Sequence, residues 1–168
     1  MSVYKDIRKK LSLTRDEVCD KANELKFPLQ SERLERIENG KFDIQPEEVM
    51  LLSQIYGEPM LCNHYCSKEC PIGQKYVPEI KVKDLAQIVL EMLSSLNSMK
   101  KSQERLIEIT ADGEISDDEI KDFVFIQKEL ERISITVETL QLWVEKMLAE
   151  EKINIEKYKK IKDDINSQ

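Results

Sequence analysis

The chain has 168 residues, of which 40% are hydrophobic and 35% are charged, with only four glycines and five prolines. This composition excludes a disordered or fibrous protein, and the long stretches without Gly or Pro favour helices over strands. The formal net charge of -7 argues against a nucleic-acid binder that relies on a broad basic surface, because phosphate neutralisation by Lys and Arg supplies most non-specific affinity.

The sequence shows no sign of a membrane or secreted protein. No apolar run approaches the ~18 residues that a membrane span needs. Residues 1–10 mix Lys, Arg and Asp and lack the apolar core of a secretion signal. We therefore expect a cytoplasmic protein without a membrane partner.

Residues 1–59 are predicted to form a domain of four or five short helices. Thr14 and Glu17 have the spacing of a capping box, so a helix begins there. Asn39 and Gly40 close a later helix, and Pro46 suits a first helical turn. Apolar residues recur between these signals at helical spacing: Tyr4, Ile7 and Leu11, then Val18, Ala22 and Leu25, then Leu34 and Ile37, then Val49, Leu52 and Ile55.

Two strings in this domain carry a family resemblance. Residues 13–18 read Leu-Thr-Arg-Asp-Glu-Val, and residues 36–41 read Arg-Ile-Glu-Asn-Gly-Lys. Together they resemble the phage-repressor-like (xenobiotic-response-element) helix-turn-helix family over about the first 58 residues. The resemblance implies an all-α, lambda-repressor-like bundle whose third helix enters the major groove of double-stranded DNA.

The resemblance also implies which residues contact DNA. Arg15 would touch a phosphate at the start of the second helix, and Lys41 would hold the flanking backbone. The residues on or beside the recognition helix are Gln30, Ser31, Glu32, Arg33 and Arg36.

Two features depart from the family pattern and support a second hypothesis. Residues 23–28 make the turn before the recognition helix longer than usual, and Glu32 and Glu35 place negative charge on that helix. A carboxylate can accept a hydrogen bond from cytosine, but phosphates repel it. The alternative is a protein-binding adaptor or antirepressor that keeps the fold without specific DNA recognition. The apolar spacing by itself indicates only a small helical bundle, but the string at residues 36–41 favours the family resemblance.

Residues 60–79 are predicted to be a cysteine-containing linker. If they are helical, a spacing of four places three thiols on one face: Cys62, Cys66 and Cys70. Cytosolic thiols are normally reduced, so zinc, an iron–sulfur cluster or a redox response is favoured over a disulfide. His64, Cys19 or a partner chain could supply a fourth ligand. Equally, the thiols can serve as small buried hydrophobes, the interpretation we favour for Cys19, while an exposed position is favoured for His64.

Residues 80–168 are predicted to form a helical hairpin that dimerises. Apolar residues follow a heptad pattern on two long helices, which are expected to pack antiparallel as a coiled coil. A pair of narrow apolar stripes commonly needs a second hairpin, so we predict a homodimer, with a last short helix at about 155–165. The seam positions are 85, 89, 92, 96, 99, 103 and 106 on the first helix and 123, 126, 130, 133, 137, 140, 144 and 147 on the second.

The loop between these helices is similar to part of a calcium-binding EF-hand loop. Asp112, Gly113, Ile115 and Glu119 match that pattern, but Glu108 stands where it requires Asp. A turn at 112–113 followed by a capping box from Ser116 to Glu119 accounts for the same residues, and we favour it.

The sequence gives no reason to expect an enzyme. It contains one His, no nucleophile paired with a base and no phosphate-binding glycine loop. The leading hypothesis is a DNA-binding transcriptional regulator that acts as a homodimer, modulated by metal or redox state at the three cysteines. Its layout resembles regulators carried on bacterial chromosomes or mobile elements.

Overall fold

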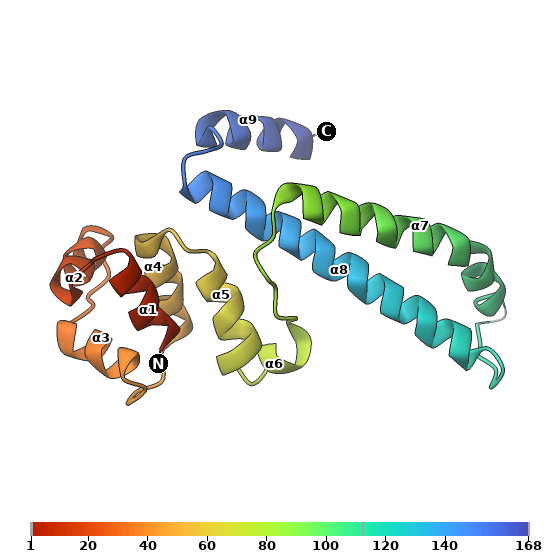
Figure 1. The fold of residues 1–168 in the computed structure, drawn as a ribbon, viewed down its shortest axis with the longest axis horizontal. Coiled ribbons are helices and arrows are strands. Elements are labelled where there is room, and N and C mark those ends of the chain that lie inside the picture. Colours follow the sequence, from red (N-terminus) through yellow and green to blue (C-terminus); the bar gives the residue numbers. More distant parts are fainter. Residues whose placement is uncertain (1, 112, 168) are drawn as a thin grey trace. The chain divides into compact units, whose positions relative to one another are not determined.

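A computed structural model describes residues 2–111 and 113–167 of the chain. Every regular element in these ranges is a helix (Figure 1), so the predicted all-α class is confirmed. The chain divides into two compact units, Met1–Glu79 with Glu145–Gln168, and Ile80–Val144. This division differs from the predicted third domain, 80–168, because residues after 144 group with the first unit.

Four helices form the first part of unit 1 (Figure 1). Their bounds are α1 Val3–Lys10, α2 Arg15–Glu24, α3 Ser31–Glu38 and α4 Pro46–Tyr56. The predicted capping box starts α2, since the backbone N–H of Glu17 donates to the Thr14 hydroxyl and the Thr14 N–H donates to the Glu17 carboxylate at 2.7 Å. Pro46 occupies the first turn of α4, as predicted.

The core of unit 1 is apolar and closed to solvent. Tertiary packing joins α1, α2, α3 and α4 around it. Most of the apolar positions predicted from helical spacing pack in it, but Leu11 and Leu25 are 42% and 43% exposed because they lie at the ends of α1 and α2. Its fully buried members are Val18, Ala22, Leu34, Leu52 and Leu61. Cys19 is also buried in this cluster, as its position predicts.

The connection between α2 and α3 is long, as the sequence indicates. Helix α2 ends at Glu24, and Lys26 adopts a left-handed conformation with a φ of 60°. Phe27 and Leu29 pack onto the core from this segment, and Leu29 is 4% exposed. The long connection is therefore a packed part of the bundle.

Residues 60–79 are not the linker that the sequence predicts. They form α5 Met60–His64, the π-helix η1 Tyr65–Glu69 and α6 Gly73–Tyr76. Leu61 is fully buried in the core, and Cys62 and Tyr65 pack against it. Gly73 lies so close to η1 that a Cβ atom there would stand 2.0 Å from the Cys66 carbonyl oxygen. The segment belongs to the bundle because its apolar side chains complete the core.

Unit 2 contains most of two long helices, α7 Leu85–Ile109 and α8 Ile120–Ala149 (Figure 1). A short connection reverses the chain, so the two helices lie side by side and antiparallel. The Asp84 side chain caps α7, and the predicted Ser116–Glu119 pairing precedes α8, where the Ser116 hydroxyl donates to the carboxylate at 2.6 Å. Asp112 of the calcium-loop pattern lies outside the described residues. Helix α9, Ile155–Asn166, follows in unit 1.

The residues buried on α7 and α8 coincide only in part with the predicted seam. On α7 the buried residues are Ile88, Ser95 and Ile109, while the predicted seam residues Val89 and Leu96 are 42% and 49% exposed. On α8 the predicted seam residue Ile126 is buried, and so are four residues off the seam: Glu129, Thr136, Thr139 and Leu142. Several of the buried side chains are small or polar. Part of the predicted apolar seam on each helix therefore faces solvent.

Candidate nucleic-acid interface

Helix α3 turns one face to the core and the other to solvent. Leu34, Ile37 and Glu38 are buried, whereas Glu32, Glu35 and Arg36 are exposed. Because residues three or four apart share a helix face, the exposed face combines two carboxylates with one guanidinium. This is the surface on which any base contact from α3 would have to occur.

Glu38 anchors the inner side of α3 through two arginines. Its side chain has no exposed surface; the Arg8 guanidinium donates to it through Nε and also through Nη2 at 2.8 Å, and Arg15 Nε donates at 2.9 Å. Burial alone would raise the pKa of the Glu38 carboxyl, but the hydrogen bonds from both arginines outweigh it and lower that pKa. Glu38 is therefore a charged, fully partnered group that ties α3 to α1 and α2.

The predicted phosphate contact Arg15 is engaged inside the bundle. Besides its hydrogen bond to Glu38, its Nη1 lies 3.7 Å from Glu35 Oε1, and 28% of its side chain is exposed. Two carboxylates thus offset most of its charge. Arg15 orients α3 in this structure, and a phosphate would have to compete with Glu35 for the exposed part of its guanidinium.

Arg33 is likewise a structural side chain. Its guanidinium makes a bidentate contact with Glu48, from Nε at 2.8 Å and from Nη2 at 2.7 Å, and Nη2 also donates to the Asp43 carbonyl at 3.0 Å. The guanidinium carbon lies 4.3 Å from the centre of the Phe42 ring. This arrangement fixes α3 to α4 and leaves Arg33 little freedom to read a base.

The remaining predicted DNA contacts lie at the surface. Arg36 and Lys41 are exposed, and neither forms an ion pair with any other described residue. Gln30 is exposed immediately before α3, and its side chain does not cap the helix. Ser31 is half-buried at the first position of α3. The structure therefore offers Gln30, Glu32, Arg36 and Lys41 to an approaching ligand.

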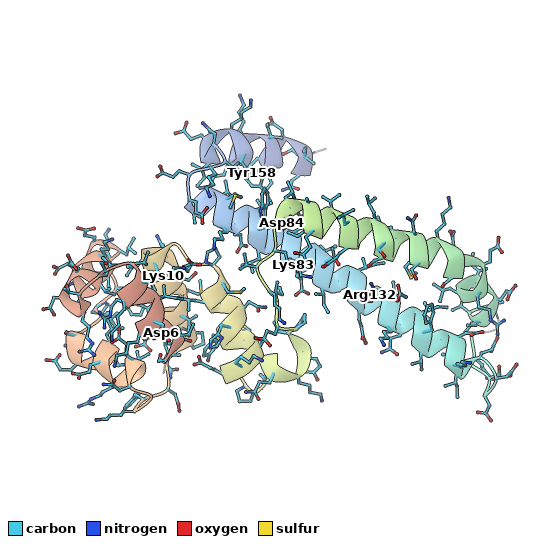
Figure 2. All side chains as sticks on the ribbon, viewed as in Figure 1. Asp6, Lys10, Lys83, Asp84, Arg132 and Tyr158 are labelled. Carbon is cyan, nitrogen blue, oxygen red and sulfur yellow. The ribbon has the colours of Figure 1, made fainter. Side chains whose placement is uncertain are left out.

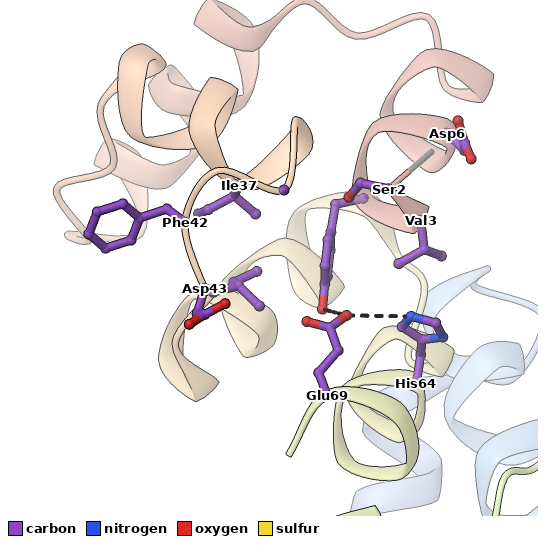
Figure 3. A pocket seen from close by; sticks show the side chains of 11 residues that line it. Ser2, Val3, Asp6, Ile37, Phe42, Asp43, His64 and Glu69 are labelled. Atoms are coloured by element: carbon purple, nitrogen blue, oxygen red, sulfur yellow. Dashed lines mark hydrogen bonds and ion pairs between the residues drawn. The ribbon is translucent and has the colours of Figure 1, made fainter. Parts of the chain in front are cut away.

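A cavity of about 450 Å³ lies elsewhere in unit 1 (Figure 3). It is bounded by the start of α1, by residues 40–44 and by His64 and Glu69. The Tyr4 hydroxyl donates to Glu69 at 2.9 Å, and His64 Nε2 lies 3.4 Å from the same carboxylate. Burial, together with the charge of Glu69, raises the pKa of Tyr4. Asp6 and Asp43 also line the cavity, so its acidic character does not suit a phosphate ligand.

The cysteine segment does not form a metal centre among the described residues. No group of three or more His, Cys, Asp or Glu side chains there converges as a metal ion requires. The Gly73 backbone N–H lies 3.5 Å from Cys70 Sγ, and burial, followed by the neighbouring thiols, raises the pKa of Cys66. A raised pKa reduces the thiolate form that binds metals. The predicted zinc or iron–sulfur ligation gains no support from this geometry.

The ion pairs of Glu38 and Glu48 are the features that the sequence interpretation missed. A usable signal exists for Glu38, which follows Leu34 by one helical turn and therefore falls on the buried face of α3. A charged residue at such a position requires partners of opposite charge. The identity of those partners depends on how α1 and α2 pack, which helical spacing does not determine.

Comparisons of the chain with protein-family models, curated proteins and solved structures found no match. The described helices include none with both the length and the apolar character of a membrane span.

Proposed function

We propose that the chain is a DNA-binding transcriptional regulator that reads double-stranded DNA with α3 and acts as a homodimer through a C-terminal hairpin of α7 and α8. The observation that carries the proposal is the exposed set Gln30, Arg36 and Lys41, which lies at the start, middle and end of the α3 region. An Arg side chain can donate two hydrogen bonds to guanine, and Lys can contact the neighbouring phosphate.

The rigidity of α3 supports this proposal. Glu38 ties the helix to α1 and α2, and Arg33 ties it to α4 through Glu48. A recognition element held on several sides presents its outer side chains in one geometry, which favours sequence discrimination. In this account Arg15 and Arg33 act as positioning residues, and Arg36 makes the specific contact.

The charge of the domain supports a dimer over a single DNA-binding unit. Residues 1–60 contain ten Lys or Arg and twelve Asp or Glu, a net of -2, so one unit gains little non-specific attraction to DNA. Two units bound to adjacent half-sites raise the effective affinity without any further contact.

A protein-binding adaptor is the second candidate, and a specific observation favours it. Two of the three arginines that the family resemblance assigns to DNA contact, Arg15 and Arg33, are engaged in ion pairs, while Glu32 and Glu35 are exposed on α3. This surface is also suited to a basic segment of another protein.

Selection from a pool of random duplex DNA at low salt separates the two candidates. The regulator predicts enrichment of a sequence motif, a loss of at least tenfold in affinity for Arg36→Ala, and little change for the charge-matched control Lys160→Ala on α9. If the pool shows no enrichment, or if Arg36→Ala and the control bind equally well, DNA recognition by α3 is wrong and the adaptor is favoured.

A further inference from the structure

Each long helix of unit 2 carries a stripe of exposed apolar residues directly beside its buried row. On α7, Val89 and Leu96 follow the buried Ile88 and Ser95 by one residue. The same offset recurs on α8, where the exposed stripe follows the buried Glu129 and Thr136 by one residue: Leu130, which is 47% exposed, and Val137, which is 40% exposed.

The two stripes lie on one face of the α7–α8 pair. One residue forward rotates a position by about 100° in the same sense on every α-helix. In an antiparallel pair whose buried rows face each other, equal rotations carry both stripes to the same side of the two-helix layer. One residue backward gives the opposite side, which is polar on α7, where Gln87 and Ser94 are exposed, whereas on α8 it carries both Lys128 and the exposed Ile135. The layer therefore has one face that is apolar on both helices and an opposite face that is polar on α7.

The contact between the two helices is itself partly polar. Ser95 is 2% exposed and Glu129 is 5% exposed. Within α8, Arg132, which is labelled in Figure 2, donates to the Glu129 carboxylate at 3.0 Å. Burial of these groups contributes less to stability than burial of leucine. The pair thus leaves several large apolar side chains about half exposed.

The exposed apolar area is of the size that a stable interface requires. We define the apolar face as Leu85, Val89, Leu93, Leu96, Leu130 and Val137, which are between 40% and 53% exposed. They present roughly 500 Å² per chain, near the upper end for the largest patch of a monomer. Two such faces together amount to about 1,000 Å², the lower bound for a specific interface, and the polar residues around them add to that area.

We propose that a second copy of this chain covers the apolar face with its own apolar face, which gives a four-helix dimer in which Ser95 and Glu129 stay inside each α7–α8 pair. The inference rests on the proposed function for the role of the dimer and adds the surface that forms it. A two-fold axis places the same patch on both subunits. The apolar face satisfies that requirement, because the face of one subunit then packs against the identical face of its partner.

Sedimentation equilibrium of the full chain tests this surface. The unchanged chain is expected to dimerise at micromolar concentration, and V89E/L96E is expected to weaken dimerisation at least 100-fold. The matched control Q87E/S94E adds the same charges to the same turns of α7 on the polar face and is expected to dimerise as the unchanged chain does. The helical circular dichroism signal shows whether V89E/L96E is folded. If it is misfolded, L130Q, a milder change on α8, serves as the second test.

Three outcomes would overturn the proposal. The unchanged chain stays monomeric at 100 μM or above, or the control Q87E/S94E dissociates as strongly as V89E/L96E. The third outcome applies if V89E/L96E is misfolded, and it is that L130Q dimerises as strongly as the unchanged chain. Binding to a selected half-site, measured on the same proteins, separates this result from the proposed function. A chain that binds DNA but never dimerises overturns the apolar face and the homodimer, and leaves DNA recognition by α3 standing. A chain that dimerises through this face without enriching any DNA sequence overturns DNA recognition alone.

Discussion

The helical bundle at the start of unit 1 and the α7–α8 pair use similar sequence patterns with different results. In the bundle, leucines such as Leu34 and Leu52 are fully buried, and the charged groups inside are paired. In the α7–α8 pair, Leu96 and Leu130 are about half exposed, while Ser95 and Glu129 are buried. The bundle completes its own core, whereas the apolar face of the pair remains open. Amphipathic spacing therefore predicts a helix, and it does not say which surface covers the apolar side.

Breaking the ion-pair anchor of the bundle is expected to have the largest effect. Glu38→Ala leaves Arg8 buried without its partner and removes a hydrogen bond from Arg15, so we expect a loss of about 3–5 kcal/mol in the free energy of unfolding. Chemical denaturation measures this loss. Glu35→Ala, an exposed carboxylate on the same helix, serves as the control and should cost less than about 1 kcal/mol. Equal losses for the two variants would show that Glu38 is no anchor.

A pair of leucine truncations sharpens the contrast between a closed core and an open face. Leu34→Ala should cost about 2–5 kcal/mol at any protein concentration, because it leaves a cavity in the bundle. Leu96→Ala should cost about 0.5 kcal/mol or less in dilute protein and more as the concentration rises, since only the dimer buries Leu96. Denaturation at two concentrations tests both. A large, concentration-independent cost for Leu96→Ala would mean that the monomer already buries this residue.

Gly73 tests whether residues 60–79 belong to the bundle. A methyl group there would stand 2.0 Å from the Cys66 carbonyl oxygen, so Gly73→Ala must displace the backbone and should cost about 1–3 kcal/mol. Ile72→Ala, a neighbouring change at a residue that is 72% exposed, is the control. Thermal unfolding that leaves both variants as stable as the unchanged chain would indicate that the segment is loosely attached.

Acid should weaken the bundle through Glu38 and Glu48. The pKa values of Glu38 and Glu48 are lowered in the folded state because the hydrogen bonds from their arginines outweigh burial. Their contribution is present above the unfolded carboxyl pKa of about 4.3 and is lost as pH falls below it toward the folded pKa values. A pH titration of unfolding should show a shallower decline below pH ~4.5 for Glu48→Gln, by on the order of 1 kcal/mol. If the free energy of unfolding falls with pH equally steeply in Glu48→Gln and in the unchanged chain, this prediction is wrong.

Local signals in the sequence predicted the secondary structure well. The capping residues Thr14 and Glu17 act within one helical turn, so no tertiary information is needed to place the start of α2. The same holds for Pro46 at α4. The sequence predicts a linker at residues 60–79, whereas Leu61 belongs to the core, because a short segment carries too few apolar repeats to show that it packs against a neighbouring bundle.

The candidate site was harder to predict, because it depends on which long-range partners each charge finds. The family resemblance places Arg15, Arg33 and Arg36 near the recognition helix, and only packing reveals that the first two bind Glu38 and Glu48. The predicted seam of α7 is wrong at Val89 for a related reason. A heptad pattern selects apolar residues, whereas the structure buries Ser95 and leaves Val89 42% exposed.

The most direct test of the regulator is the stoichiometry of the full chain on the duplex that it selects, measured by sedimentation at micromolar protein. A homodimeric regulator should place two chains on one duplex that carries two half-sites. At protein concentrations where the unchanged chain saturates this duplex, the V89E/L96E variant should lose both chains together. One chain per duplex, or a selected duplex with a single unpaired half-site, would contradict it.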